Sequence, residues 1–426
     1  MSTSPRRPRL HLTAPAGWVN DPLGLTHHAG EYHLFYQHVP GATAWEPGCH
    51  WGHATSPDLL HWTHHEPALS PGDGDDGCWS GCVTVPPDGG AMLFYTSVQR
   101  DRLDIGRVRV ARPADHGWRS WTKGEVVAEL PEGLRAVAHR DPVVVRDGDT
   151  WLMLLGAGLA DGTATVLVHT SPDLRTWEYA GPLAGRPAEE REPLWLGVAW
   201  ECPQLLALGD RHVLTLSAWE PAGPVHEAYG VGRLVDGRLE VERWARLTHG
   251  PSSYAGTAFV DTAGRRGLVH WLRGVADPEE GWAGALSLPH VVTLDGDRLV
   301  TAPHPALDAL RGPGAAVAAG GREEVPGTCE VRWEPGPGGR LAVTGRDGGA
   351  VLDLHVDADG VHAETGEGAW AVPLPGAPDE VRLVLDGPVA EVFAGGEVLA
   401  LPVPVPPAGP ALAVSAGRAR VHRLGG

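Results

Sequence analysis

Short hydrophobic runs recur along the first part of the chain, and long amphipathic helical patterns are nearly absent. Each run is rich in aromatic or β-branched residues and is bounded by Gly, Asp or Pro, as strands separated by tight turns are. The clearest runs are 31–37, 91–98, 150–156, 212–219 and 267–272. The hydrophobic pattern therefore predicts an all-β protein.

A repeated segment that ends in Trp divides this region into similar units. The sequence S-P-D-L-L-H-W ends at Trp62, A-D-H-G-W-R-S-W at Trp121 and S-P-D-L-R-T-W at Trp177, with a looser copy, L-E-V-E-R-W, ending at Trp244. Intervals of roughly 55 to 70 residues, each holding several strands, are typical of β-propeller blades. With a first blade around residues 17–60, the repeat predicts five blades.

The pattern changes after residue 310. A Gly/Ala-rich stretch, 311–321, is followed by short alternating strands at 340–344, 351–356, 381–385, 390–394 and 411–416. Such spacing fits a small β-sandwich of about 100 residues. We therefore expect a propeller over residues 1–310, a linker over 311–325 and a sandwich over 326–426.

Composition and charge narrow the classes of function. The 426 residues include 58 Gly and 39 Pro, as many turns require, and the formal net charge is −19. That charge, with no Lys/Arg stripe, argues against a nucleic-acid partner. No run approaches the ~18 apolar residues of a membrane span, so we expect no membrane partner. The start of the chain shows no secretion signal, which predicts a cytoplasmic location; a processed or differently exported form remains an alternative.

Cysteine and histidine spacing gives no sign of a metal or cofactor. The five cysteines lack metal-type spacing, so reduced thiols are the simplest interpretation. The pairs His27-His28 and His64-His65 point to opposite faces of a strand, which favours surface residues over ligands. We expect neither a metal nor a cofactor.

Three carboxylates stand in short motifs joined to Pro: N-D-P at Asp21, R-D-P at Asp141 and E-C-P at Glu201. Each motif alone is a common turn opener. However, the motifs fall in three different repeats, and the innermost strands of propeller blades converge on one axis. Carboxylates gathered at an axis repel one another, an arrangement that acid/base chemistry selects and stability alone does not.

The chain resembles glycoside hydrolase family 32, the β-fructofuranosidases. G-W-V-N-D-P-L-G (17–24) is similar to that family's W-M-N-D-P-N-G block. The further motifs follow in family order: Y-H-L-F-Y-Q-H (32–38), H-W-G-H-A-T-S-P-D-L-L-H-W (50–62), G-C-W-S-G (77–81), H-R-D-P (139–142), W-E-C-P (200–203), S-Y-A-G-T-A-F (253–259), G-W-A-G-A-L-S-L-P (281–289) and E-V-F (391–393). Several such motifs in order are far more specific than any one of them.

The resemblance implies a five-bladed propeller, a C-terminal sandwich and a retaining mechanism. In it, Asp21 is the nucleophile, Glu201 the general acid/base and Asp141 a stabiliser of the transition state. A retaining glycosidase holds its nucleophile and its acid about 5–5.5 Å apart. The expected activity is release of fructose from non-reducing β-D-fructofuranosyl ends of sucrose, fructo-oligosaccharides or fructans.

A substrate-binding shell is expected around these carboxylates. Amides read sugar hydroxyls well, and Arg140 can hold Asp141 ionised or donate to a hydroxyl. For the aromatic members, packing between blades is the alternative, as it is for Trp62, Trp121 and Trp177 of the repeat. The expected shell is Asn20, Gln37, Trp45, Trp79, Ser80, Arg140, Tyr254, Trp271 and Trp282.

Departures from the family pattern leave substrate choice open. They are Leu23 for Asn, Gln204 for Asp, and Ser252, Ser253 and Thr257 in the block around Tyr254. We expect them to lie where the leaving-group sugar is read. Two alternatives remain: a fructosyltransferase that uses the same intermediate, and a non-catalytic fructan-binding protein. A monomer and a dimer are both compatible with the sequence.

Overall fold

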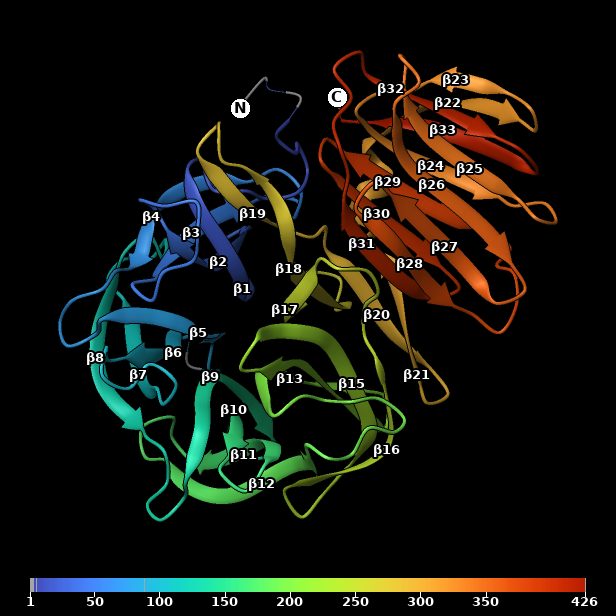
Figure 1. Ribbon diagram of the computed structural model, residues 1–426. Coiled ribbons are helices and arrows are strands. Elements are labelled where there is room, and N and C mark those ends of the chain that lie inside the picture. The colour runs from blue at the N-terminus through green and yellow to red at the C-terminus, as the bar shows by residue number, and fades with distance from the viewer. Residues whose placement is uncertain (1–3, 5, 88, 426) are drawn as a thin grey trace.

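The structure is a computed structural model that describes residue 4, residues 6–87 and residues 89–425. The described residues form five four-stranded blades around an axis, followed by a β-sandwich at the side of blade V (Figure 1). The predicted all-β class, the propeller and the sandwich are thus confirmed. Among the described residues, no helix has the length and apolar content that crossing a membrane requires.

Each blade is an antiparallel sheet whose strands run outward in chain order. Blade I comprises β1 (Gly17–His28), β2 (Glu31–Val39), β3 (His50–Ser56) and β4 (Thr63–Leu69). Blade II comprises β5 (Gly77–Thr84), β6 (Met92–Val98), β7 (Arg107–Pro113) and β8 (Trp121–Ala128). Blade III comprises β9 (Ala136–Asp147), β10 (Thr150–Leu159), β11 (Thr163–Ser171) and β12 (Glu178–Pro187).

Blade IV comprises β13 (Ala199–Leu208), β14 (Arg211–Glu220), β15 (Gly223–Val235) and β16 (Arg238–Arg246). Blade V comprises β17 (Ser253–Val260), β18 (Arg266–Asp277), β20 (His290–Asp295) and β21 (Arg298–Pro303). An additional strand, β19 (Trp282–Leu286), pairs antiparallel with β18 and parallel with β1, with Gly17 opposite Trp282. This strand joins blade V to blade I and closes the ring.

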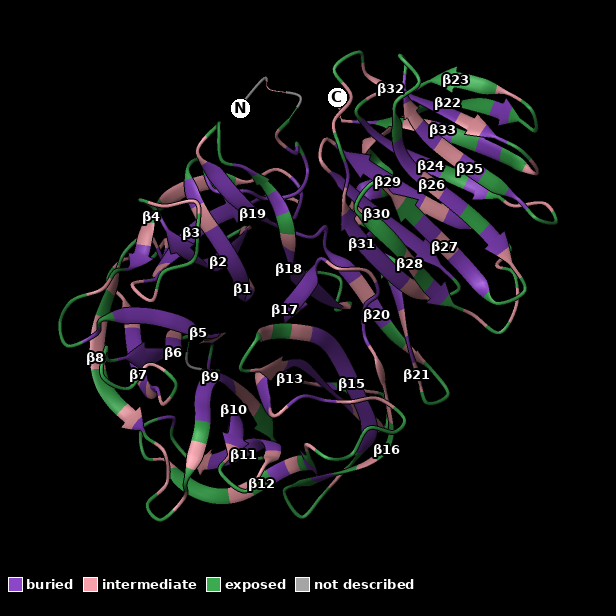
Figure 2. Cartoon of the chain, viewed as in Figure 1, coloured by how far each residue is buried: buried purple, intermediate pink, exposed green. Residues whose placement is uncertain are grey.

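Burial falls from the axis to the rim. The innermost strands are mostly buried, whereas the outermost strands β8 and β16 alternate between exposed and partly buried residues (Figure 2). A separate hydrophobic cluster fills the contact between neighbouring blades: Phe35 and Trp51 of blade I meet Leu93 and Tyr95 of blade II, for example. Sheets that pack face to face in this way hold the inner strands in fixed positions.

The Trp repeat marks one turn in each of the first three blades. It connects the third strand to the fourth, and the carboxylate of Asp173 accepts hydrogen bonds from the backbone N–H groups of Arg175 and Thr176 there. Leu174 has a φ of +62° within this turn, and its buried side chain anchors it. Trp177 packs in the cluster between blades II and III. The repeat is therefore structural, which agrees with the packing alternative.

In the described part of the chain, two six-stranded sheets form the sandwich. The first has the order β22 (Arg311–Ala318), β33 (Arg418–Leu424), β24 (Thr328–Glu334), β29 (Val381–Asp386), β30 (Val389–Ala394) and β31 (Glu397–Pro402). The second has the order β23 (Arg322–Glu324), β32 (Pro410–Val414), β25 (Arg340–Gly345), β26 (Ala350–Asp357), β27 (Gly360–Thr365) and β28 (Gly368–Pro373). One large apolar core, which includes Trp333, lies between them.

The segment predicted as a linker, 311–325, belongs largely to the sandwich. A short 3₁₀-helix, η1 (Pro305–Leu310), leads directly into β22, which pairs with β33, and β23 pairs with β32. The expectation of a free connector is wrong because its backbone groups complete the edges of both sheets. The remaining boundaries, 1–310 and 326–426, stay a prediction.

Candidate active site

Breaks in the strand ladders present the three carboxylates. The ladder between β1 and β2 skips from Val19 to Pro22, and the ladder between β13 and β14 skips from Glu201 to Gln204. Proline has no N–H to donate, so a strand bulges where it enters. A third break lies in the ladder between β9 and β10, where Arg140 pairs with Gly156 and Val143 with Leu154. Cys202 at the second break and Asp141 at the third adopt φ values of +47° and +63°. Each Pro-linked motif therefore interrupts the backbone hydrogen bonds of its strand and lets the carboxylate side chain leave the plane of the sheet.

Asp21 lies at the break in β1 and receives a ring of donors. Its carboxylate accepts hydrogen bonds from Asn20 Nδ2 at 2.9 Å, from Gln37 Nε2 at 3.1 Å and from the hydroxyl of Ser80. Burial, together with the charge of Glu201, raises the pKa of Asp21, while the Ser80 and Asn20 donors oppose that shift. The donors favour the ionised form that a nucleophile needs.

Asp141, at the break in β9, is the most deeply enclosed of the three. Its Oδ2 accepts the backbone N–H of Cys202 at 3.1 Å, and its own N–H donates to Thr96 Oγ1 at 2.8 Å. Burial, followed by the charge of Glu201, raises the pKa of Asp141 to about 7. Arg140 partly offsets this shift.

Glu201 is held at both oxygens. Arg140 Nε donates to Oε1 at 2.9 Å, and the hydroxyl of Tyr254 donates to Oε2 at 2.6 Å. The guanidinium of Arg140 also lies over the ring of Trp219, 5.2 Å from its centroid. The carboxylate of Glu201 stays 16% exposed, more than the rest of this group, so it is the member that solvent reaches best.

The sulfur atom of Cys202 lies between the carboxylates of blades I, III and IV. Cys202 Sγ lies 3.5 Å from Asp21 Oδ2 and 3.6 Å from Asp141 Oδ2, and Cys202 follows Glu201 directly in β13. Burial and the surrounding carboxylates raise the pKa of this thiol well above its ordinary value, so it stays protonated and can donate. The structure thus gathers the three predicted carboxylates into one buried group.

Most of the predicted binding shell surrounds this group. Asn20, Gln37 and Ser80 contact Asp21 directly, and Arg140 and Tyr254 contact Glu201. Trp79 and Trp45 form an edge-to-face pair, with ring centroids 5.6 Å apart, and Trp45 is 45% exposed. Trp271 packs edge-on against Tyr254, and its buried Nε1 has no partner.

Trp282 does not join the shell. Its ring is fully buried among Leu272, Val275 and Ala400 where the propeller meets the sandwich, and Arg7 lies over it at 5.0 Å. Trp282 belongs to strand β19, which closes the ring of blades by pairing with β1 and β18.

Two of the departures from the family pattern, Leu23 and Gln204, also lie away from the expected place. Leu23 packs between blades I and II with Phe35 and Trp51, so it cannot read a sugar. Gln204 is buried and bridges blades IV and V, since its Oε1 accepts the N–H of Ala258 and its Nε2 donates to the carbonyl of Pro203. The expectation that these positions meet the leaving group is wrong for both side chains, because they support the frame.

Two residues around the carboxylates were not among the predicted ones. Thr96 anchors the backbone of Asp141, and Trp18 Nε1 donates to Asn20 Oδ1 at 2.9 Å. Trp18 stands inside the N-D-P block, so its place in that motif was a usable signal. Thr96 lies in an ordinary hydrophobic run and carries none.

Residues 11–303 match the glycosyl hydrolases family 32 N-terminal domain. The chain is 35% identical over 330 residues to a sucrose-6-phosphate hydrolase of Escherichia coli and 34% identical over 326 residues to a raffinose invertase of the same organism. Both alignments cover 71% of this chain and 66% of the relative, so the chain spans about two thirds of their length. A solved GH32 beta-fructofuranosidase from Bombyx mori superposes with a TM-score of 0.86 at 25% identity, covering 99% of this chain and 94% of that one.

Proposed function

The chain belongs to glycoside hydrolase family 32, and from this premise we propose that it is a retaining glycosidase acting on β-D-fructofuranosides. The observation that carries the proposal is the cluster itself: carboxylate oxygens of Asp21 and Asp141 lie within 3.6 Å of the sulfur of Cys202, beside Glu201. In this group, Asp21 and Glu201 would supply the two carboxyl groups that a two-step displacement at one sugar carbon uses.

In the first step, the Asp21 carboxylate attacks C2 of the fructosyl unit while the C2–O bond to the leaving group breaks. Glu201, in its acid form, gives its proton to the departing oxygen. In the second step, Glu201 takes a proton from water, whose oxygen attacks C2 and displaces Asp21. Fructose leaves and both acids return to their starting forms.

Asp141 and the hydrogen-bond donors around Asp21 would stabilise the positive charge that develops at C2 in the transition state. The carboxylate of Asp141 can bind two fructose hydroxyls and holds the flattened ring better than the ground-state ring. Its fixed position, set by Thr96 and Cys202, makes this an arrangement prepared before the substrate arrives.

The proposed substrates are the non-reducing fructosyl ends of sucrose, fructo-oligosaccharides or fructans. The cation at the cluster, Arg140, is already paired with Glu201, which favours an uncharged sugar over a phosphorylated one. The predicted cytoplasmic location stays a prediction.

A panel of sucrose, kestose, inulin, levan and sucrose phosphate, with an activated aryl fructoside, tests the proposal. Asp21→Ala is expected to abolish turnover on every substrate. Glu201→Ala is expected to lower kcat by about 10²–10⁴-fold on natural substrates and much less on the aryl fructoside, whose leaving group needs no proton. Asp210→Asn, which changes an exposed carboxylate on blade IV, is the matched control and keeps full activity.

If Glu201→Ala lowered kcat equally on activated and natural substrates, Glu201 could not be the general acid. If Asp21→Ala turned over substrate at the wild-type rate, Asp21 could not be the nucleophile. Trisaccharide products at high sucrose would move the chain to the transferase class, and binding without turnover in the wild type would make it a binding protein.

A further inference from the structure

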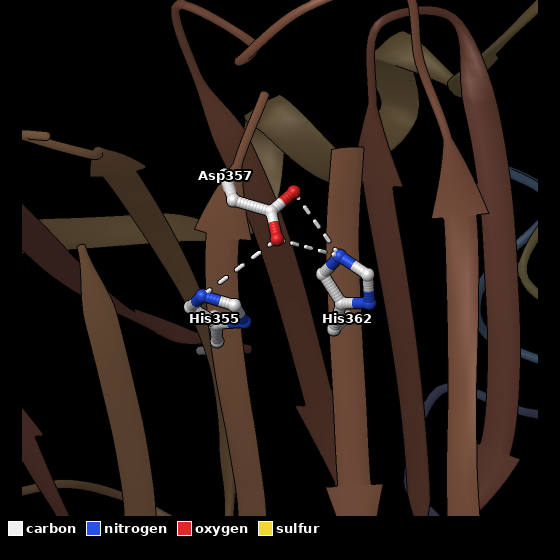
Figure 3. Close-up of side chains that lie close together, drawn as sticks. All are labelled: His355, Asp357 and His362. Atoms are coloured by element: carbon white, nitrogen blue, oxygen red, sulfur yellow. Dashed lines mark hydrogen bonds and ion pairs between the residues drawn. The ribbon is translucent and has the colours of Figure 1, made fainter. Parts of the chain in front are cut away.

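A second group of chemically active side chains lies in the sandwich, on the hairpin formed by β26 and β27. His355 and His362 are directly opposite each other across the two strands, and Asp357 lies two residues beyond His355 on the same face. Figure 3 shows the three side chains converging above the sheet. Within the described residues, this is the one place where three His, Cys, Asp or Glu donors lie close enough together to hold a metal ion.

The distances suit a small cation. His362 Nε2 lies 3.2 Å from Asp357 Oδ2, and His355 Nε2 lies 3.9 Å from the same oxygen. All three donor atoms lie within 4.8 Å of one another. Tetrahedral zinc, with bonds of about 2.0–2.2 Å, places its ligand atoms roughly 3.3 Å apart, so small side-chain rotations close the site.

The donors are partly fixed before any ion binds. The N–H of Asp359 donates to Asp357 Oδ1 at 2.8 Å, and the two imidazole rings are stacked with centroids 5.2 Å apart. Such support by neighbouring groups orients ligands for a metal.

The surrounding charges favour a cation. Arg340, next to His355 on β25, donates to Asp353 at 2.6 Å, which neutralises its charge locally. Glu364 stands opposite Asp353 on β27, on the same face as His362. The side chains of His355, Asp357 and His362 are 35–48% exposed, so an ion has direct access from solvent.

We propose that His355, Asp357 and His362 form a binding site for a divalent transition-metal ion of the zinc class, with water completing the coordination. Two imidazoles and one carboxylate select such ions over Mg²⁺ and Ca²⁺, which prefer oxygen ligands. The ion bridges β26 and β27, so its role is to stabilise the sandwich. The site is independent of the carboxylates in the propeller and of the activity proposed for them.

Isothermal titration of the full chain, made without a histidine tag and freed of metal by chelation, tests the site. We expect one Zn²⁺ per chain that excess Mg²⁺ does not displace, and a Zn²⁺-dependent rise in the melting temperature. His355→Gln and His362→Gln are each expected to lose this binding while their metal-free melting temperatures match the wild type.

His422→Gln changes another sandwich histidine, whose Nδ1 lies 3.1 Å from the carbonyl of Gly312, and this variant is expected to bind Zn²⁺ as the wild type does. Replacement of Zn²⁺ by Co²⁺ reports the ligand field by visible absorption, and that spectrum should disappear in both ligand variants. Absence of stoichiometric binding in the wild type, or unchanged binding in His362→Gln, would overturn the proposal. Either result leaves the glycosidase proposal untouched.

Discussion

At the scale of single residues, Asp141 shows a conflict between stability and chemistry. It is a carboxylate enclosed by protein and next to two others, and its pKa of about 7 reflects first burial and then the charge of Glu201. An acid whose pKa is higher in the folded than in the unfolded chain destabilises the fold once it ionises. The destabilisation is absent below about pH 4, the ordinary carboxyl range, and grows until the pH passes about 7.

Asp141→Asn is therefore expected to raise the melting temperature more at pH 8 than at pH 5, while abolishing turnover. The amide keeps an oxygen that accepts the N–H of Cys202 but carries no charge. Thermal unfolding of both proteins at the two pH values measures the difference. A gain of the same size at pH 5 and pH 8 would show that charge is not the cause.

At the scale of strands and blades, a buried ion-pair group holds blade II. Asp75, just before β5, accepts from Lys123 at 2.8 Å on β8 and from Arg109 at 2.9 Å on β7. Burial alone would raise the pKa of Asp75, but the Lys123, Ser97 and Arg109 donors lower it. The carboxylate is thus ionised and ties the first strand of the blade to the outer two.

Asp75→Asn is expected to destabilise the protein by about 3–5 kcal/mol, because it leaves two nearly buried cations without their counter-charge. The neighbouring Asp76→Asn is the control, since Asp76 is 45% exposed, its ion pair with the exposed Arg100 spans 3.6 Å, and the amide oxygen of Asn can still accept the backbone N–H of Arg100. Chemical denaturation measures both variants. Similar small losses for the two variants would contradict the structural role of Asp75.

The elements also show what the sequence could predict. Strands and blades follow from local signals, since each Trp turn has its own capping Asp and each strand its own apolar run. The three carboxylates were predictable because a Pro-linked bulge is a local signal. The symmetry of the blades then predicts that equivalent positions meet at the axis. The side taken by Leu23 was not predictable, because the bulge between Val19 and Pro22 turns the following side chains to the other face. The position of Trp282 was not, because it depends on contacts with Arg7 and with Ala400, which are distant in the sequence.

The same limit applies to residues 311–325. Their Gly and Ala content gives little strand propensity, and β22 is an edge strand whose only neighbour in its sheet, β33, lies at the far end of the chain. Pairing between segments this distant in sequence is decided by tertiary packing, which outweighs local propensity.

At the scale of the whole molecule, buried charges join the propeller to the sandwich. His11, ahead of blade I, lies 2.9 Å from Asp386 and 3.5 Å from Glu391 of the sandwich. His290 of blade V contacts the other oxygen of Glu391 at 3.1 Å. Burial alone would lower the pKa of His11, but its hydrogen bond to Asp386 and its ion pair with Glu391 raise it to about 9. Its positive charge therefore fastens the two domains together.

This histidine predicts a pH dependence of stability. A raised pKa contributes stability that is complete below pH 6.5 and is lost as the pH rises through about 9. His11→Gln is expected to lower the melting temperature clearly at pH 6 and to flatten its decline up to pH 9.5. The exposed His116→Gln is the control and follows the wild type at each pH. An unchanged pH profile in His11→Gln would remove this residue from domain docking.

Closure of the propeller by β19 has a consequence for folding during synthesis. The strand that carries Asp21 is completed by a partner around Trp282, and Tyr254 reaches Glu201 from blade V. When a ribosome has translated Asp21, Asp141 and Glu201, it has still to translate Tyr254 and strand β19. Contacts between such distant segments form late in folding. The nascent chain therefore cannot hold these carboxylates in their folded arrangement until β19 has paired with β1.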